Sequence, residues 1–174
     1  PYQDYQGPLY VVNLLTASPG SGVAYTQAYT YEGAQVHLQG RGFMGFSLQK
    51  MQDSRDSLYR RQVRRQDFPY TGLVVESELR QSNDTTVIQK TVNTPVKLDF
   101  GGTNQTAYFP YVNLSVTDLN EFGGAQNGQA VSKETTTTAV DSYGNPTTVS
   151  VSRQDLDTGS PWSGQTFQLQ TVNL

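Results

Sequence analysis

Cysteine is absent from the chain, which excludes disulfide bonds, thiolate metal ligands and cysteine nucleophiles. Histidine occurs once, at His37, so a histidine-dependent catalytic triad or metal site would have to be built on that residue. Because His37 alternates with Val36 and Leu38 in an expected strand, it should point away from them and toward solvent. A zinc site would lack both a second histidine and a thiolate. We therefore expect a structural histidine, with no metal, no cofactor and no catalysis.

Long apolar runs are also missing, and no segment reaches the length of a membrane-spanning helix. The net charge is only −3, which favours neither a nucleic acid nor an anionic membrane as a partner. Basic residues concentrate between Arg55 and Arg65, but strand alternation divides them between two faces. Asp53, Asp56 and Asp67 lie close enough in sequence to neutralise them. We interpret this run as a solvated, ion-paired surface.

Ala, Glu and Lys, the usual helix formers, are scarce, whereas Thr, Val, Tyr, Gln, Ser and Gly dominate. This composition is typical of antiparallel sheets with one buried and one solvated face. We predict an all-β fold: an antiparallel meander of many short strands, arranged as a sandwich or an extended sheet, without substantial helix. With 174 residues, the chain is long enough to bury a core.

Alternating apolar residues and turn-forming clusters give the expected strand positions. The expected strands cover residues 10–15, 23–31, 34–38, 42–51, 58–66, 73–80, 85–92, 95–100, 105–117, 133–140, 147–153 and 164–172. We expect one module over residues 1–174, with a sub-division into 1–100 and 103–174 at a double glycine. Because the chain starts with Pro1 and its strand pattern runs to the end, we also expect it to be excised from a longer polypeptide.

The segment from Tyr29 to Gly72 has the densest aromatics and the tightest glycine spacing in the chain. Glycine alternates with large apolar residues in Gly40-Arg41-Gly42-Phe43-Met44-Gly45-Phe46, which predicts a kinked or bulged strand packed closely on a neighbour. The glycine spacing also matches a dinucleotide-binding fingerprint. We reject that interpretation because a polar strand follows the glycines, where the fingerprint needs a helix.

Several motifs in this segment resemble a region of large bacterial Rhs/YD-repeat proteins, including the B component of insecticidal toxin complexes and the plasmid-virulence B proteins. Pro8–Val12 and Tyr143–Pro146 show a similar resemblance outside the segment. The motif residues are Tyr31, Gly33, Gly40, Arg41, Gly42, Phe43, Gly45, Phe46, Gln66, Asp67, Phe68, Pro69, Tyr70 and Gly72.

The resemblance implies a non-catalytic structural and assembly module of a large secreted or cell-surface bacterial protein. Its partners would be flanking β-rich regions of the same polypeptide, with self-association through edge strands as a further interaction. The self-cleaving aspartyl motif of these relatives has no counterpart in this chain. Residues 10–15 and 164–172 are the edge strands expected to lack neighbours.

A carbohydrate- or surface-binding adhesin module is the alternative function. Exposed aromatic residues lining a groove would favour it, whereas aromatic residues packed between strands would favour the structural module. The aromatic residues in question are Tyr108, Phe109, Tyr111 and Trp162.

Other polar patterns suggest metal, acid-pair or glycosylation sites, with weaker support. Asp155-x-Asp157-x-Gly159 suggests a calcium loop but lacks the remaining ligands, and Glu76 and Glu78 form an acid pair of undefined separation. Three segments match the N-glycosylation acceptor pattern, beginning at Asn83, Asn104 and Asn113. In a chain this rich in Asn and Thr, chance matches of this kind are expected.

Overall fold

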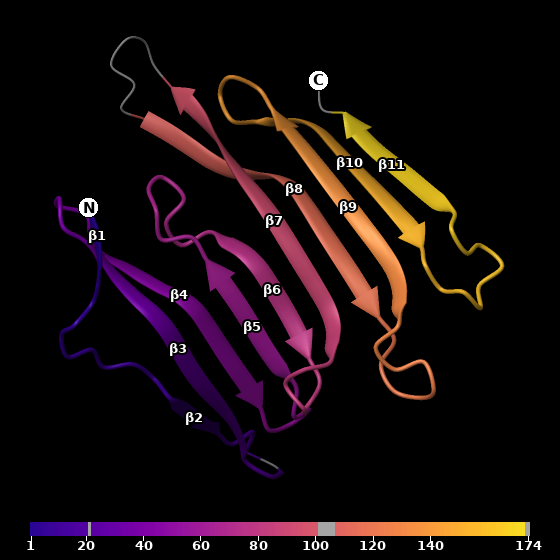
Figure 1. Ribbon diagram of the computed structural model, residues 1–174, viewed down its shortest axis with the longest axis horizontal. Helices are drawn as coiled ribbons and strands as arrows, with labels where there is room; N and C mark the ends of the chain where they lie inside the picture. Colours follow the sequence, from indigo (N-terminus) through magenta and orange to yellow (C-terminus); the bar gives the residue numbers. More distant parts are fainter. Residues whose placement is uncertain (21, 101–106, 173–174) are drawn as a thin grey trace. The chain divides into compact units, whose positions relative to one another are not determined.

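The computed structural model describes residues 1–20, 22–100 and 107–172. These residues form eleven β-strands and no helix, which confirms the all-β prediction. Accordingly, none of the described residues belongs to a helix that could span a membrane. The chain divides into two compact units, Pro1–Val87 and Ile88–Leu174, each of which is an antiparallel meander (Figure 1). The boundary expected at residues 101 and 102 lies outside the described residues, so the proposed sub-division stays a prediction.

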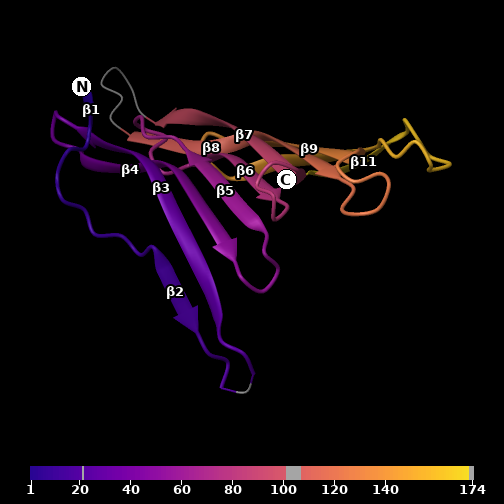
Figure 2. The ribbon, with the colours of Figure 1, turned by 60° about the horizontal axis from the view of Figure 1, so that its bottom comes forward.

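Six strands build the first unit: β1 (Tyr2–Asp4), β2 (Leu14–Ala17), β3 (Tyr25–His37), β4 (Gly42–Asp53), β5 (Tyr59–Arg64) and β6 (Val74–Arg80). They follow the order β1-β3-β4-β5-β6, and β2 also pairs with β3. β1 pairs with the end of β3, where Tyr2 lies opposite His37, and β2 pairs with its beginning, where Leu14 lies opposite Ala28. Within this unit, β2 and β3 turn away from β5 (Figure 2), as the natural twist of a sheet requires.

Two expected boundaries in this unit are wrong. The strand expected at residues 10–15 begins only at Leu14, and the apolar residues before it are exposed and outside any strand. The turn expected at Glu32 and Gly33 is part of the continuous strand β3. Gly33 adopts a φ of +66° there, so the glycine marks a local distortion of a strand where the sequence suggested its end.

The other strands are β7 (Val87–Phe100), β8 (Ala107–Asn120), β9 (Ala130–Val140), β10 (Pro146–Asp155) and β11 (Thr166–Val172). They pair antiparallel in chain order. β7 joins two stretches predicted as separate strands, because Pro95 causes a register shift and does not end the pairing. Pro110 pairs with Lys97 of β7 but lies beyond the part of β8 that pairs with β9. The proline therefore occupies a local edge, as its missing N–H group favours.

Both units bury few apolar side chains. Met44 and Ile88 are the buried hydrophobic residues of the described chain, at 6% and 8% exposure. No described side chain is less than 2% exposed, whereas Tyr10 and Val23 are almost completely exposed. The core expected from the length of the chain is therefore minimal, because each unit is a sheet of one layer. Within each unit the strands form an extended sheet and not a sandwich.

We predict that Met44→Ala lowers the free energy of unfolding by about 2 kcal/mol, because it removes one of the few buried apolar side chains. Leu38→Ala is the control, since Leu38 is 62% exposed, and its effect should stay within about 0.5 kcal/mol. Urea denaturation followed by circular dichroism measures both values. Equal losses for the two variants would contradict the assignment of Met44 to a core.

Candidate functional site

A glutamine side chain connects two glycines of the first unit that have positive φ angles. Gly33 in β3 and Gly45 in β4 have φ values of +66° and +85°. The Gln66 amide nitrogen donates hydrogen bonds to the Gly33 oxygen at 2.6 Å and to the Gly45 oxygen at 2.8 Å. We call these three residues the clamp. It joins β3, β4 and the turn that follows β5, which lie far apart in sequence.

A bulge in β4 accounts for the position of Gly45. Between the pairs Ala34–Phe46 and Val36–Phe43, β4 has one residue more than β3. The extra residue turns the backbone and displaces its polar groups from the regular ladder. A displaced carbonyl needs another donor, and the Gln66 amide provides one to each strand.

Gly33 is required by space as well as by backbone angle. A Cβ atom at this position would lie 2.0 Å from Ser47 Oγ, which donates a hydrogen bond to the Glu32 oxygen at 3.2 Å. At Gly42 and Gly45 a Cβ atom would meet no atom within 4 Å. Glycine is therefore favoured at these two positions only by the backbone conformation, since their φ values are +73° and +85°.

Aromatic rings gather beside the clamp. The ring centroids of Tyr31 and Phe46 are 4.9 Å apart, and Phe43 lies 5.7 Å from both Phe46 and Tyr5. The Tyr31 hydroxyl donates a hydrogen bond to the Val12 oxygen at 3.1 Å. These rings contribute to an open groove of about 430 Å³, which is lined by Tyr5, Leu9, Tyr29, Tyr31, Ala34 and Phe46 among others.

The turn from Gln66 to Gly72 packs on the same region. The Arg41 guanidinium lies 3.4 Å from the centroid of the Phe68 ring, and the Phe68 N–H donates to the Tyr2 hydroxyl at 3.1 Å. Gly72, with a φ of +85°, closes the turn by donating its N–H to the Arg65 oxygen at 2.8 Å.

The structure places several of the motif residues in contact, namely Gln66 with Gly33 and Gly45, Arg41 with Phe68, and Tyr31 with Phe46. Gly40 is in the tight β3–β4 turn, and Asp67 and Tyr70 both contact Arg65. The Phe68–Pro69 peptide bond is cis. Sequence reasoning missed Tyr2, Tyr5 and Ser47, because only the strand register places them against the motif.

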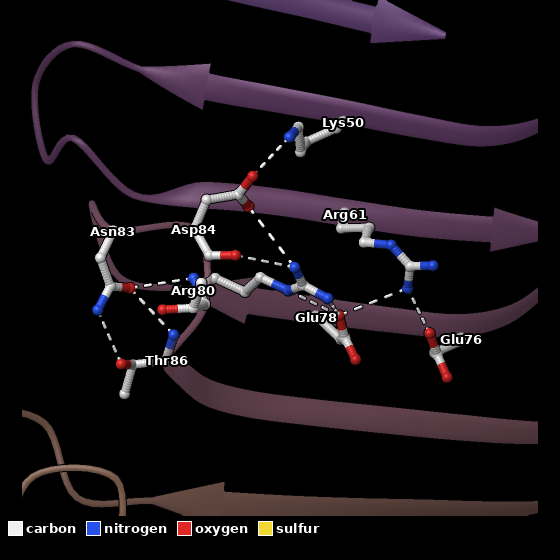
Figure 3. Close-up of polar contacts among 9 residues, drawn as sticks. Lys50, Arg61, Glu76, Glu78, Arg80, Asn83, Asp84 and Thr86 are labelled. Atoms are coloured by element: carbon white, nitrogen blue, oxygen red, sulfur yellow. Dashed lines mark hydrogen bonds and ion pairs between the residues drawn. The ribbon is translucent and has the colours of Figure 1, made fainter. Parts of the chain in front are cut away.

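An ionic network on β4, β5 and β6 was also missed (Figure 3). Lys50, Arg61 and Glu78 lie directly opposite one another in the sheet. Lys50 pairs with Asp84 at 2.6 Å, Arg80 pairs with Glu78 at 2.5 Å, and Arg61 pairs with Glu76 and Glu78. These ion pairs link three cations to three carboxylates. The expected acid pair, Glu76 and Glu78, is joined by one shared arginine.

The basic run is neutralised as predicted. Arg55 pairs with Asp53 at 2.6 Å, Arg60 pairs with Asp56 at 2.6 Å, and Arg65 pairs with Asp67. The Asp53 side chain is only 3% exposed. Hydrogen bonds from the Arg55 side chain, and then from Gln27, hold the pKa of Asp53 well below its ordinary value. Hydrogen bonds from Arg60 and Arg65 likewise lower the pKa values of Asp56 and Asp67.

His37 contributes to local packing. Its ring lies edge-on to Tyr2, with centroids 4.9 Å apart, and its Nδ1 accepts a hydrogen bond from the Gln39 N–H at 3.2 Å. The ring is half-buried against β1, whereas the sequence predicted a solvent-facing position. Pairing of β1 with β3, which sequence alternation does not reveal, covers it.

The calcium hypothesis finds no support in the described residues, which contain no group of three or more metal-binding side chains. Asp155 accepts hydrogen bonds from the Asp157 N–H and the Ser160 hydroxyl, and Asp157 accepts one from the Gly159 N–H. These carboxylates therefore stabilise the β10–β11 turn. Asn83 has the same role in its hairpin, accepting hydrogen bonds from the N–H groups of Thr85 and Thr86.

The aromatic residues considered for sugar binding do not form one platform. Phe109 stacks on Tyr111 at 6.0 Å and lies against Gly144 in the β9–β10 turn. Trp162 belongs to the β10–β11 turn, at the other end of β10. The Lys97 ammonium lies over the Tyr108 ring in a cation–π contact. Asn113 is in β8, and the acceptor pattern at Asn104 lies outside the described residues.

Comparison with known proteins identifies a shared fold. No protein-family model matches the chain, and no curated protein matches its sequence. The crystal structure of TcdB2-TccC3 aligns with 75% of this chain and 9% of its own length, at a TM-score of 0.62 and 12% identity. The same protein without its hypervariable C-terminal region aligns with 87% of this chain and 10% of its own, at a TM-score of 0.60 and 11% identity.

A third crystal structure, of TcdB2-TccC3-TEV, aligns with 87% of this chain and 10% of its own length, at a TM-score of 0.61 and 11% identity. The chain therefore spans about a tenth of the length of the toxin-complex proteins that it matches. The fold relationship to toxin-complex proteins, expected from the sequence motifs, is confirmed at the level of architecture.

The clamp leads to a prediction for Gln66→Glu. This substitution keeps the size of the side chain but replaces the shared donor with a carboxylate facing two carbonyl oxygens. We expect the free energy of unfolding at neutral pH to fall by about 2 kcal/mol or more. Gln66→Ala should cost less, and Gln49→Glu on β4, outside the clamp, should change stability by at most about 0.5 kcal/mol. Similar losses at positions 49 and 66 would argue against the clamp.

The lowered carboxylate pKa values predict acid sensitivity. A carboxylate whose pKa is lower in the folded chain than in the unfolded chain stabilises the fold at pH values above its unfolded pKa. For Asp53 the unfolded pKa is 3.8. The stabilisation disappears as the pH falls from there toward the lower pKa of the folded state. The free energy of unfolding should therefore decrease on acidification below about pH 4. Asp53→Asn and Arg55→Gln should both flatten this decrease in urea titrations performed at a series of pH values. An unchanged slope in both variants would contradict the role of the pair.

Proposed function

We propose that this chain is a non-catalytic structural module of a large secreted bacterial protein of the Rhs or toxin-complex type. Flanking β-rich regions of the same polypeptide are its partners, and they cover the faces of its sheets. The observation that carries the proposal is the fold shared with a tenth of TcdB2-TccC3.

The burial of the side chains supports this proposal. A self-contained domain normally closes an apolar core between two layers. Here the described residues bury only Met44 and Ile88 among the hydrophobic side chains, while a run of large apolar side chains between Leu9 and Leu15 is exposed. Such surfaces on a soluble protein mark contacts with other protein. Neighbouring strands or layers of the same polypeptide would supply those contacts.

The polar clusters of the first unit also suit a structural role. The clamp, the Arg41–Phe68 contact and the network around Glu78 connect strands to each other. Their ion pairs neutralise charged side chains, and their hydrogen bonds give partners to backbone carbonyls. Their geometry fixes strand register and the bulge in β4, as an assembly module needs.

We predict that the exposed apolar residues become protected in the parent polypeptide. Hydroxyl-radical labelling of Tyr10, Val23 and Trp162 should be strong in the isolated chain, because these side chains are 98%, 91% and 56% exposed. Labelling should be reduced at these residues in the full-length protein, with Met44 as the buried control in both forms. Mass spectrometry of the digested protein measures each rate.

Equal labelling of these residues in the two forms would contradict the proposal. Specific glycan binding by the isolated chain, reduced by Trp162→Ala, would favour the adhesin function instead. Hydrolase turnover that is lost in His37→Ala would contradict a non-catalytic role.

A further inference from the structure

The loop between β8 and β9 contains the one asparagine–glycine dipeptide of the chain, Asn127-Gly128. Both residues are exposed and lie outside any strand. Glycine has no Cβ atom, so another group can approach its backbone nitrogen more closely than that of any other residue. We propose that Asn127 is a site of spontaneous modification, at which the side-chain amide is lost by deamidation.

The reaction consumes only water. The Gly128 backbone nitrogen attacks Cγ of Asn127 and loses its proton, and the side-chain nitrogen leaves as ammonia. The intermediate is a succinimide ring that contains both carbonyl carbons of residue 127. Water then opens the ring: attack at the side-chain carbonyl gives aspartate, and attack at the backbone carbonyl gives isoaspartate. In both products a hydroxyl group has replaced the amide nitrogen, and nothing is oxidised or reduced.

A hydrogen bond within the loop prepares the Asn127 side chain for this attack. The Gly123 N–H donates to Asn127 Oδ1 at 2.8 Å. Attack on Cγ places negative charge on this oxygen, and a fixed backbone donor stabilises such charge. The bond from the Gly128 N–H to the Glu121 oxygen, at 2.9 Å, opposes the attack and must open first. Exposed loop residues open at a low cost in free energy, so this bond slows the reaction without preventing it.

The hairpin that contains Asn83 provides an internal comparison with similar hydrogen bonds. Asn83 Oδ1 also accepts backbone N–H bonds, and the Asp84 N–H also donates to a backbone oxygen. Asp84 and Gly128 both have a positive φ, of +57° and +85°. The two sites differ in the residue that follows the asparagine, since the Asp84 side chain restricts the approach to its own nitrogen. Asn83 should therefore react more slowly than Asn127.

Other asparagines of the described chain are less suited to the reaction. Asn145 precedes Pro146, whose nitrogen has no proton to lose. Asn93 and Asn113 belong to β7 and β8, where the extended backbone keeps the next nitrogen away from the side chain.

The two products should affect the loop differently. Isoaspartate lengthens the backbone between residues 127 and 128 by one atom, whereas bonds from Glu121 to Gln129 and from Gly128 to Glu121 close the loop at 2.8 and 2.9 Å. We expect isoaspartate to break these bonds and aspartate to keep them. The loop also forms one wall of an open groove of about 740 Å³, opposite residues 156–159. Modification therefore changes the shape of this groove and adds a negative charge near it.

This inference goes beyond the proposed function and does not depend on it. The proposed function concerns the faces of the sheets, and labelling of Tyr10 and Val23 tests it. The chemistry of Asn127 is measured separately, so either proposal can fail while the other holds.

Peptide mapping by mass spectrometry, after incubation of the folded chain near neutral pH for weeks, measures the reaction at each asparagine. Asn127 should convert at least about tenfold faster than Asn83, because a side chain on the attacking residue raises the barrier. Isoaspartate and aspartate should both appear at position 127. Equal rates at the two asparagines, no conversion at Asn127, or aspartate without isoaspartate would overturn the inference.

Gly128→Asp is the matched variant, because it gives Asn127 the same following residue as Asn83. Aspartate is among the residues that tolerate a positive φ, and circular dichroism verifies the fold. The rate at position 127 should fall to about that of Asn83. Asn127→Asp, which has the charge of the product without the additional backbone atom, should keep the hydrogen-exchange protection of the Gly128 amide, and the isoaspartate form should lose it. An unchanged rate in Gly128→Asp would also overturn the inference.

Discussion

Within each unit the described residues form a sheet of one layer, and the rest of the structure depends on this constraint. A sheet of one layer cannot exclude water from both of its faces, so hydrophobic burial contributes little to its stability. Only Met44 and Ile88 are buried hydrophobic residues in the described chain. Register and shape must then come from the backbone ladder and from pairs of side chains across neighbouring strands.

The first unit meets this constraint with polar and aromatic contacts. Gln66 holds the carbonyls of Gly33 and Gly45, and the Arg61 guanidinium joins Glu76 to Glu78. Each contact joins residues from different strands or turns, so a slip in register would separate them. Half-buried ion pairs of this kind add specificity where packing is weak. They also make the fold sensitive to acid through carboxylates such as Asp53.

The open surfaces connect this architecture to assembly. Exposed aromatic and aliphatic side chains form the surfaces that the proposed neighbouring regions of the polypeptide would cover. The fold is shared with about one tenth of the length of TcdB2-TccC3, and the proposed structural role rests on this likeness.

The sequence by itself determined the fold class, most strand positions and the local neutralisation of the basic run, because these follow from alternation and from residues close in the chain. The motif residues were singled out only through a family resemblance, and the sequence did not predict the contacts between them. The tertiary structure alone decided that Gly33 lies within a strand, that Gln66 spans two strands, and that Lys50 pairs with Asp84, 34 residues away. The physical reason is that strand register places such residues together, and a single sequence contains no record of register.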